Sequence, residues 1–154
     1  MLVSNMLDIE DYQWAKKALR SLDFFSHCSD EDILSLVENL EKLTYKAGST
    51  ILFKGEISNR FYIVHTGKVG IWKTAGGEKK QVAELGPDKY FGEISLMTPT
   101  TATATVKAEA ESQIFALSYE NLEFSFRKNP EALATIQKKI EERRQSQSSA
   151  PSQS

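Results

Sequence analysis

The fold class follows from one stretch, Gly48 to Trp72, which reads GSTILFKGEISNRFYIVHTGKVGIW. It contains short runs of β-branched and aromatic residues, such as Arg60 to Thr66, and a glycine or a charged residue separates each run from the next. Runs of this length and composition are typical of strands, and the glycines between them are typical of turns. The stretch therefore predicts consecutive β-strands.

The same pattern continues as far as Leu117. Residues 74–78, Thr-Ala-Gly-Gly-Glu, are expected to form a hairpin turn, because paired glycines readily adopt the positive φ angles that such turns require. Regular short strands with turns of this kind predict an antiparallel sandwich or barrel. The expected strands are Ser49 to Phe53, Arg60 to Thr66, Lys68 to Lys73, Lys80 to Leu85, Thr101 to Lys107 and Ser112 to Leu117.

Helices are expected before the strands. A first helix is predicted because apolar residues recur there at helical spacing. A second helix is expected to begin at Ser29, with Asp32 completing a capping box. The apolar stripe of the first helix consists of Tyr12, Ala15, Leu19 and Leu22, and that of the second of Ile33, Leu36, Val37 and Leu40.

Helical spacing returns after the last strand. Ser118 is expected to cap one helix, and Pro130 suits the first turn of a final helix. The final helix has one apolar stripe, formed by Leu133, Ile136 and Ile140. The predicted organisation is an N-terminal helix over residues 1–23, a β-domain with C-terminal helices over 24–144, and a disordered polar tail over 145–154, which has too few apolar side chains to form a core.

The composition of the chain excludes several classes of protein. The chain has 154 residues, the length of one domain, and 26% of them are charged with a net charge of −2, which excludes a strongly basic nucleic-acid-binding domain. Cys28 is the single cysteine, so no intramolecular disulfide forms, and a reducing compartment is expected. No apolar run is long enough for a membrane span, and residues 1–8 lack the pattern of a signal peptide. We therefore expect a cytoplasmic location.

The sequence predicts neither a catalytic nor a metal site. His27 and Cys28 are adjacent and His65 lies far along the chain, a spacing that is not typical of zinc ligands. The glycines at 76 and 77 lack the spacing of a phosphate-binding P-loop and lie between strands, where a P-loop would open a helix. We expect no metal, no cofactor and no enzymatic activity.

The most informative polar stretch is Phe91 to Val106, FGEISLMTPTTATATV. Gly92 permits an unusual backbone angle or the close approach of another group. Glu93 to Met97 is expected to form one short helical turn, whose first N–H groups have no partner within the turn. Such a turn beside a glycine, with threonine hydroxyls nearby, favours an anion site. The alternative is a threonine-rich loop that only joins two strands.

These two stretches resemble the cyclic-nucleotide-binding domain family, which regulates bacterial transcription factors, kinases and channels. Gly48 to Trp72 is similar to the family's glycine-punctuated first strands, and FGEISL followed by ATV is similar to its phosphate-binding cassette. The resemblance covers about Phe24 to Glu142. It implies an α+β, mainly β fold: an eight-stranded antiparallel β-roll, jelly-roll-like, with N-terminal and C-terminal helices.

The resemblance also implies roles for particular residues. Glu93 matches the glutamate that accepts a hydrogen bond from the ribose 2′-hydroxyl. The backbone amides of Gly92, Ile94 and Ser95 match those around the cyclic phosphate. Thr103 matches a hydroxyl-bearing residue that touches the phosphate and, in some members, a guanine edge.

One position departs from the family pattern. The arginine that pairs with the phosphate in the family is Ala102 here. Loss of one partner of a buried charge pair costs about 2–5 kcal/mol, which corresponds to roughly thirtyfold to several-thousandfold in affinity. Arg60, Lys89 and Lys107 are the candidates for a substitute cation.

Two functional hypotheses follow. The first is a regulatory module that senses cyclic AMP, cyclic GMP or a related anionic ligand and signals through a protein partner. The second is a degenerate domain that binds no nucleotide and acts as a protein-interaction or scaffolding unit. Intact Gly92 and Glu93 favour the first, and Ala102 favours the second. In either case no nucleic-acid partner is expected, and the resemblance implies that the last helix is the place for a homodimer contact.

Overall fold

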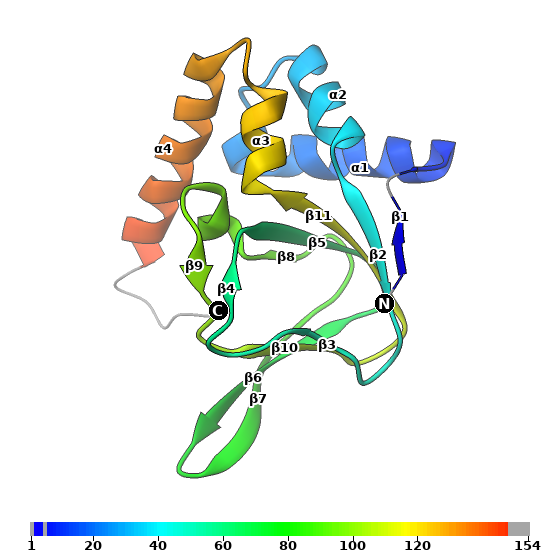
Figure 1. Ribbon diagram of the computed structural model, residues 1–154, viewed down its shortest axis with the longest axis vertical. Helices are drawn as coiled ribbons and strands as arrows, with labels where there is room; N and C mark the ends of the chain where they lie inside the picture. The colour runs from blue at the N-terminus through cyan, green and yellow to red at the C-terminus, as the bar shows by residue number, and fades with distance from the viewer. Residues whose placement is uncertain (1, 5, 148–154) are drawn as a thin grey trace.

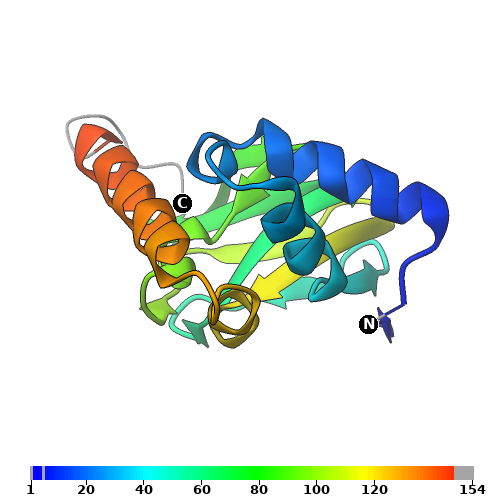
Figure 2. The ribbon, with the colours of Figure 1, turned by 90° about the horizontal axis from the view of Figure 1, so that it is seen from above.

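The computed structural model describes residues 2–4 and 6–147 of the chain (Figure 1). Figure 1 shows α1, α2 and α3 at one end of the strands and α4 along one side, and Figure 2 shows the same helices from above. The elements, in chain order, are β1 (Leu2–Ser4), α1 (Ile9–Ser21), the 3₁₀ turn η1 (Asp23–Phe25), α2 (Asp30–Glu38), β2 (Glu41–Tyr45), β3 (Thr50–Leu52), β4 (Ile57–Ser58), β5 (Arg60–Thr66), β6 (Val69–Ala75), β7 (Glu78–Leu85), β8 (Tyr90–Phe91), the 3₁₀ turn η2 (Glu93–Leu96), β9 (Thr100–Thr101), β10 (Thr105–Ala108), β11 (Ser112–Ser118), α3 (Tyr119–Ser125) and α4 (Pro130–Gln147).

The strands form an antiparallel roll of three sheets. A five-stranded sheet has the order β1-β2-β11-β5-β8, a four-stranded sheet has the order β3-β10-β6-β7, and β4 pairs with β9. Every strand pair in the described residues is antiparallel. The predicted α+β, mainly β class and the antiparallel roll with flanking helices are therefore confirmed.

The strand count differs from the prediction. Eight strands were expected, and the described residues contain eleven. The strands without a clear sequence pattern are mostly short: β4, β8 and β9 have two residues each and β1 has three. Runs of two or three residues are too short to show an alternating pattern, because alternation needs at least four residues to be recognised.

The predicted helix caps are present. Ser29 accepts a hydrogen bond from the amide of Asp32, and the Asp32 carboxylate accepts one from the amide of Ser29, which completes the capping box. The Ser118 side chain accepts from the amide of Asn121, and α4 begins at Pro130. These starts were predictable because capping depends on residues within one turn of each other.

Both chain ends differ from the predicted boundaries. The N-terminal helix, expected over residues 1–23, begins at Ile9 after the capping Asp8, and Leu2–Ser4 instead pairs with β2. The last helix continues to Gln147, so residues 145–147 of the predicted disordered tail are helical. The rest of that tail, residues 148–154, lies outside the described residues.

The predicted hairpin joins β6 and β7. Its two turn residues, Gly76 and Gly77, have φ angles of 61° and 82°. Ala75 and Glu78 pair directly across the turn. Positive φ at both central positions is the geometry of the two-residue turn that matches strand twist, so the glycine pair determines this connection.

The five-stranded sheet separates two hydrophobic cores. Phe61 and Ile63 on β5 pack under the helices, whereas Tyr62 and Val64 pack inside the roll. Successive side chains of a strand point to opposite faces, so burial on both faces gives the continuous apolar run of this strand. The apolar stripe of α4 joins the core under the helices, where Ile136 and Ile140 are fully buried.

A buried charged cluster ties α1 to the sheet. The Asp11 carboxylate lies 2.6 Å from Lys42 Nζ on β2 and 3.5 Å from His65 Nε2 on β5. Burial lowers the pKa of His65, and the nearby Asp11 carboxylate acts in the opposite direction. A buried carboxylate requires such partners, because an unpaired charge is costly to remove from water. Within the described residues, no helix has the length and apolar character needed to cross a bilayer.

Candidate functional site

One cavity of about 260 Å³ opens between η2, the segment that follows it and the inner face of the four-stranded sheet. Small-molecule sites are typically about 300–1,000 Å³, so this volume is close to the lower end of that range. All six residues predicted for the ligand site line this cavity: Gly92, Glu93, Ile94, Ser95, Ala102 and Thr103. The structure therefore brings together positions that are up to eleven residues apart in sequence.

Gly92 positions the turn at the cavity wall. Its φ angle is 81°, in the left-handed region, and it directly precedes the 3₁₀ turn η2. A Cβ atom at this position would lie 2.7 Å from the carbonyl oxygen of Arg60 on β5. Glycine is thus required here for two reasons, the backbone angle and the close approach of a neighbouring strand.

Gly92→Ala is expected to lower the free energy of unfolding by about 1–3 kcal/mol, because it combines a left-handed alanine with a backbone clash. Gly48→Ala is the matched control: Gly48 has a φ angle of 88°, but an added Cβ would meet nothing within 4 Å. Urea unfolding of both variants measures the difference. Equal losses for the two variants would show that the contact with Arg60 does not constrain position 92.

The expected short helical turn is present, and its amides are not all equivalent. The amide of Ser95 donates to the carbonyl of Gly92 at 3.0 Å, so it is engaged within the turn. The amides of Glu93 and Ile94 belong to the first turn and have no acceptor inside it. The Ser95 hydroxyl, which is buried, donates to the carbonyl of Ser58 and shares a hydrogen bond with Thr100 Oγ1. Ser95 therefore acts mainly as a structural link between η2 and the neighbouring strands.

Glu93 is the acidic residue of the cavity wall. Its side chain is partly exposed, and among the described residues none donates a hydrogen bond or forms an ion pair with its carboxylate. In the described part of the chain, therefore, no structural hydrogen bond holds this carboxylate in place. A carboxylate with free acceptor sites is suited to bind hydroxyl groups.

Ala102 and Thr103 form another part of the cavity wall. The backbone of Ala102 is held on both sides, since its amide donates to Glu56 at 2.9 Å and its carbonyl accepts from Gly55 at 2.8 Å. Its methyl group packs against the core inside the roll. Thr103 is exposed and lines the cavity. Ala102, which stands where the resemblance places an arginine, offers only a methyl group on a fixed backbone.

The three basic residues named as substitutes do not line the cavity. Arg60 pairs with Glu41 on β2 at 3.3 Å, Lys107 lies over the ring of Trp72 with its Nζ 5.7 Å from the ring centroid, and Lys89 is exposed. The basic residue at the cavity is instead Arg144 of α4. The sequence did not indicate this residue, because helical periodicity shows which face of a helix is apolar but not what a polar side chain lies beside.

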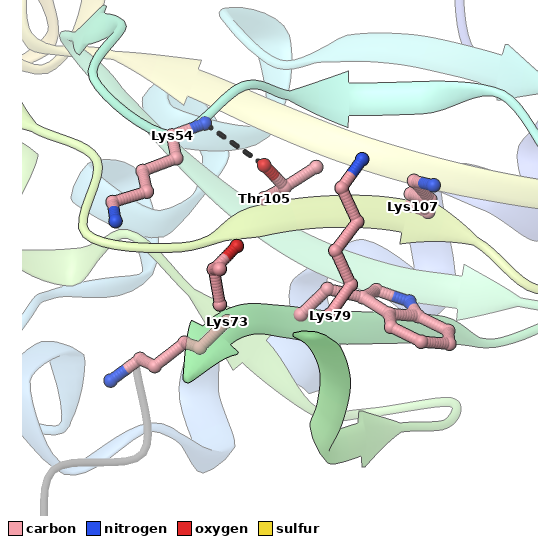
Figure 3. Close-up of a pocket in the computed structure, with 7 residues that line it drawn as sticks. Lys54, Lys73, Lys79, Thr105 and Lys107 are labelled. Atoms are coloured by element: carbon pink, nitrogen blue, oxygen red, sulfur yellow. Dashed lines mark hydrogen bonds between the residues drawn. The ribbon is translucent and has the colours of Figure 1, made fainter. Parts of the chain in front are cut away.

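A second hollow lies outside the four-stranded sheet (Figure 3). It is lined by Lys54, Lys73, Lys79 and Lys107 around Trp72. Figure 3 shows the amide of Lys54 donating to Thr105 Oγ1, at 3.1 Å. Its volume is only about 40 Å³. That volume is far below that of a typical small-molecule site, so this hollow is not the candidate site.

The metal-ligating residue types and the single cysteine are the remaining candidates for a chemical site in the described residues. No group of three or more His, Cys, Asp and Glu side chains there is placed to hold a metal ion. Burial raises the pKa of the Cys28 thiol to about 11, so the thiolate form that acts as a nucleophile is disfavoured at neutral pH.

Comparison with known proteins relates the chain to one family. The family model described as "Cyclic nucleotide-binding domain" matches residues 42–129. Cyclic nucleotide-gated channel alpha-4 of Mus musculus is 32% identical over 127 residues, which cover 79% of this chain and 22% of the channel. The Cyclic AMP receptor protein of Thermus thermophilus is 27% identical over 104 residues, which cover 67% of this chain and 48% of that protein. The chain thus spans about a fifth of the channel and about half of the receptor.

A solved structure extends this likeness to the fold. The N-terminal domain of a transcriptional regulator from Streptomyces coelicolor A3(2) superimposes with a TM-score of 0.77 at 28% sequence identity, covering 89% of this chain and 97% of that domain. The family match and the shared fold lead to one conclusion. The chain belongs to the cyclic nucleotide-binding domain family.

Proposed function

We propose that this chain is a non-enzymatic regulatory module that binds cyclic AMP or cyclic GMP in the cavity beside η2. The observation that carries the proposal is that all six predicted positions, Gly92 to Ser95 with Ala102 and Thr103, line one cavity of about 260 Å³. The family supports a nucleotide ligand, and one relative is named a cyclic AMP receptor protein. The preference between the two nucleotides is an outcome of the binding experiment.

The cavity wall offers groups for each part of a cyclic nucleotide. The Glu93 carboxylate has free acceptor sites for a ribose hydroxyl, and the first amides of η2 are available as donors to a phosphate oxygen. The inner side of the cavity is apolar and includes Leu52, Ile71 and Val106, which suits a purine face. A ligand with a polar sugar-phosphate end and a flat apolar base matches these polar and apolar parts of the cavity wall.

Isothermal titration of the chain with cyclic AMP and cyclic GMP tests the proposal. We expect weak binding, because Ala102 removes a charge partner that contributes about 2–5 kcal/mol elsewhere. Glu93→Ala is expected to weaken or abolish that binding, whereas the control Glu78→Ala, in the distant hairpin, is expected to leave it unchanged. If neither nucleotide produces a saturable heat of binding, and circular dichroism shows that the chain has its native fold, the proposal is wrong.

A second function is favoured by one observation, the methyl group at position 102. If the chain binds no nucleotide, the same roll serves as a protein-interaction or scaffolding unit. Under either function we propose that output passes through a protein partner. A homodimer through the apolar stripe of α4 would require the helix to leave the roll, because Ile136 and Ile140 are buried within this chain.

A further inference from the structure

The segment from Phe91 to Val106 contributes an acidic side chain to the cavity but no basic one. Glu93 contributes a carboxylate, while position 102 contributes a methyl group. An anionic ligand in this cavity would meet the carboxylate without a compensating charge, which is unfavourable in a partly enclosed site. Of the described residues that line the cavity, Arg144 is the only basic one, and it comes from α4.

The position of Arg144 at the cavity is held by the packing of its helix. The helix α4 is in contact with η2, and Figure 1 shows α4 running along one side of the roll. Gln137 Nε2 donates to the carbonyl of Leu96 in η2 at 3.3 Å, and one turn further along Ile140 is fully buried. Arg144 follows Ile140 by four residues, on the same side of the helix. Its guanidinium therefore reaches the cavity from α4, a helix that is anchored to the turn η2.

The guanidinium already holds an oxyanion in a bidentate arrangement. Arg144 Nε and Nη2 donate to the two carboxylate oxygens of Glu141 at 3.1 and 3.0 Å. The Arg144 side chain is 59% exposed, so the ion pair lies at the mouth of the cavity in contact with water. Exposed pairs of this kind are weak, and a phosphate presents the same paired oxygens to the guanidinium as a carboxylate does.

We propose that Arg144 supplies the positive charge for the ligand phosphate that Ala102 does not supply. This inference rests on the proposed function, because it concerns the same cavity and the same class of ligand. When a cyclic nucleotide binds, its phosphate oxygens replace the Glu141 carboxylate as the acceptors of Arg144. The cation thus comes from α4, a helix that lies outside the segment that contains position 102.

Titration of the full chain with cyclic AMP and with cyclic GMP, each at low and at high salt, tests this inference. Arg144→Gln is expected to weaken binding about five- to ten-fold at low salt and to reduce its salt dependence, because the lost charge lies at the rim. Arg143→Gln removes the same charge from the next residue, which does not line the cavity, and is the matched control. Glu141→Gln, which removes the negative charge that competes for Arg144, is expected to tighten binding about two- to five-fold.

The outcomes separate this inference from the proposed function. If the wild type binds and Arg144→Gln binds equally well, or if Arg143→Gln weakens binding as much, Arg144 has no specific role and only this inference is wrong. If the wild type binds neither cyclic nucleotide, both are wrong. Rescue of Arg144→Gln by Ala102→Arg would support it further, since both residues would then serve the same phosphate.

Discussion

Ala102→Arg is expected to tighten the binding of cyclic AMP or cyclic GMP by at least about ten-fold. Re-pairing a buried phosphate contributes about 2–5 kcal/mol when the pocket is otherwise intact, and about 1.4 kcal/mol corresponds to each factor of ten. The backbone of Ala102 is fixed by its hydrogen bonds to Gly55 and Glu56, so a longer side chain extends from a defined point into the 260 Å³ cavity. Isothermal titration of the wild type and the variant measures the gain.

Two controls define what that gain means. Glu93→Ala, made in the wild type and in Ala102→Arg, shows whether the tightened binding still depends on the Glu93 carboxylate. Thr98→Arg adds the same charge at an exposed position of the same segment that does not line the cavity, and is expected to produce a much smaller effect. If Ala102→Arg keeps the native fold by circular dichroism and binds no nucleotide, the idea of a pocket that lacks only its arginine is wrong, and the scaffolding function gains support.

Ile136→Asp is expected to lower the free energy of unfolding by about 3–5 kcal/mol, because it places an unpaired charge in an apolar core and removes a packed side chain. Ile136 has 1% of its surface exposed and belongs to the core between α4 and the sheet. A loss of this size is a large part of the about 5–15 kcal/mol that stabilises a typical domain. Urea or thermal unfolding by circular dichroism measures it.

Ala134→Asp is the matched control for this prediction. Ala134 lies on the same helix and is exposed, so the same change in charge is expected to alter the unfolding free energy by at most about 0.5 kcal/mol. If Ile136→Asp unfolds at the same urea concentration as the control, α4 does not contribute to the core. In that case, the place of Arg144 at the cavity would also need another explanation.

The local features of this protein were predictable because they depend on neighbouring residues. The capping box of Ser29 and Asp32 involves two residues three apart, and the hairpin depends on Gly76 and Gly77 alone. The short turn after Gly92 likewise forms within its own segment. In each case the residue types have one strongly preferred backbone geometry, so no tertiary contact was needed to infer it.

The shortest strands were not predictable for the opposite reason. Leu2–Ser4 and Ile57–Ser58 are strands only because β2 and β9 lie next to them. Two or three residues have too weak a preference to show this in sequence, and the hydrogen bonds come from partners tens of residues away. The same holds for the Asp11–Lys42 pair, whose members are 31 residues apart.

The sequence by itself determined the fold class and the family resemblance, because strand periodicity and the Phe91 to Val106 motif depend on residue type and spacing. The resemblance in turn implied six ligand-site positions, and all six line the cavity. Only the tertiary structure decided which charges meet there. It placed Arg60 and Lys107 away from the cavity and brought in Arg144, 42 residues after Ala102. The physical reason is that the packing of α4 against η2, through Ile140 and the Gln137–Leu96 hydrogen bond, sets where that side chain lies.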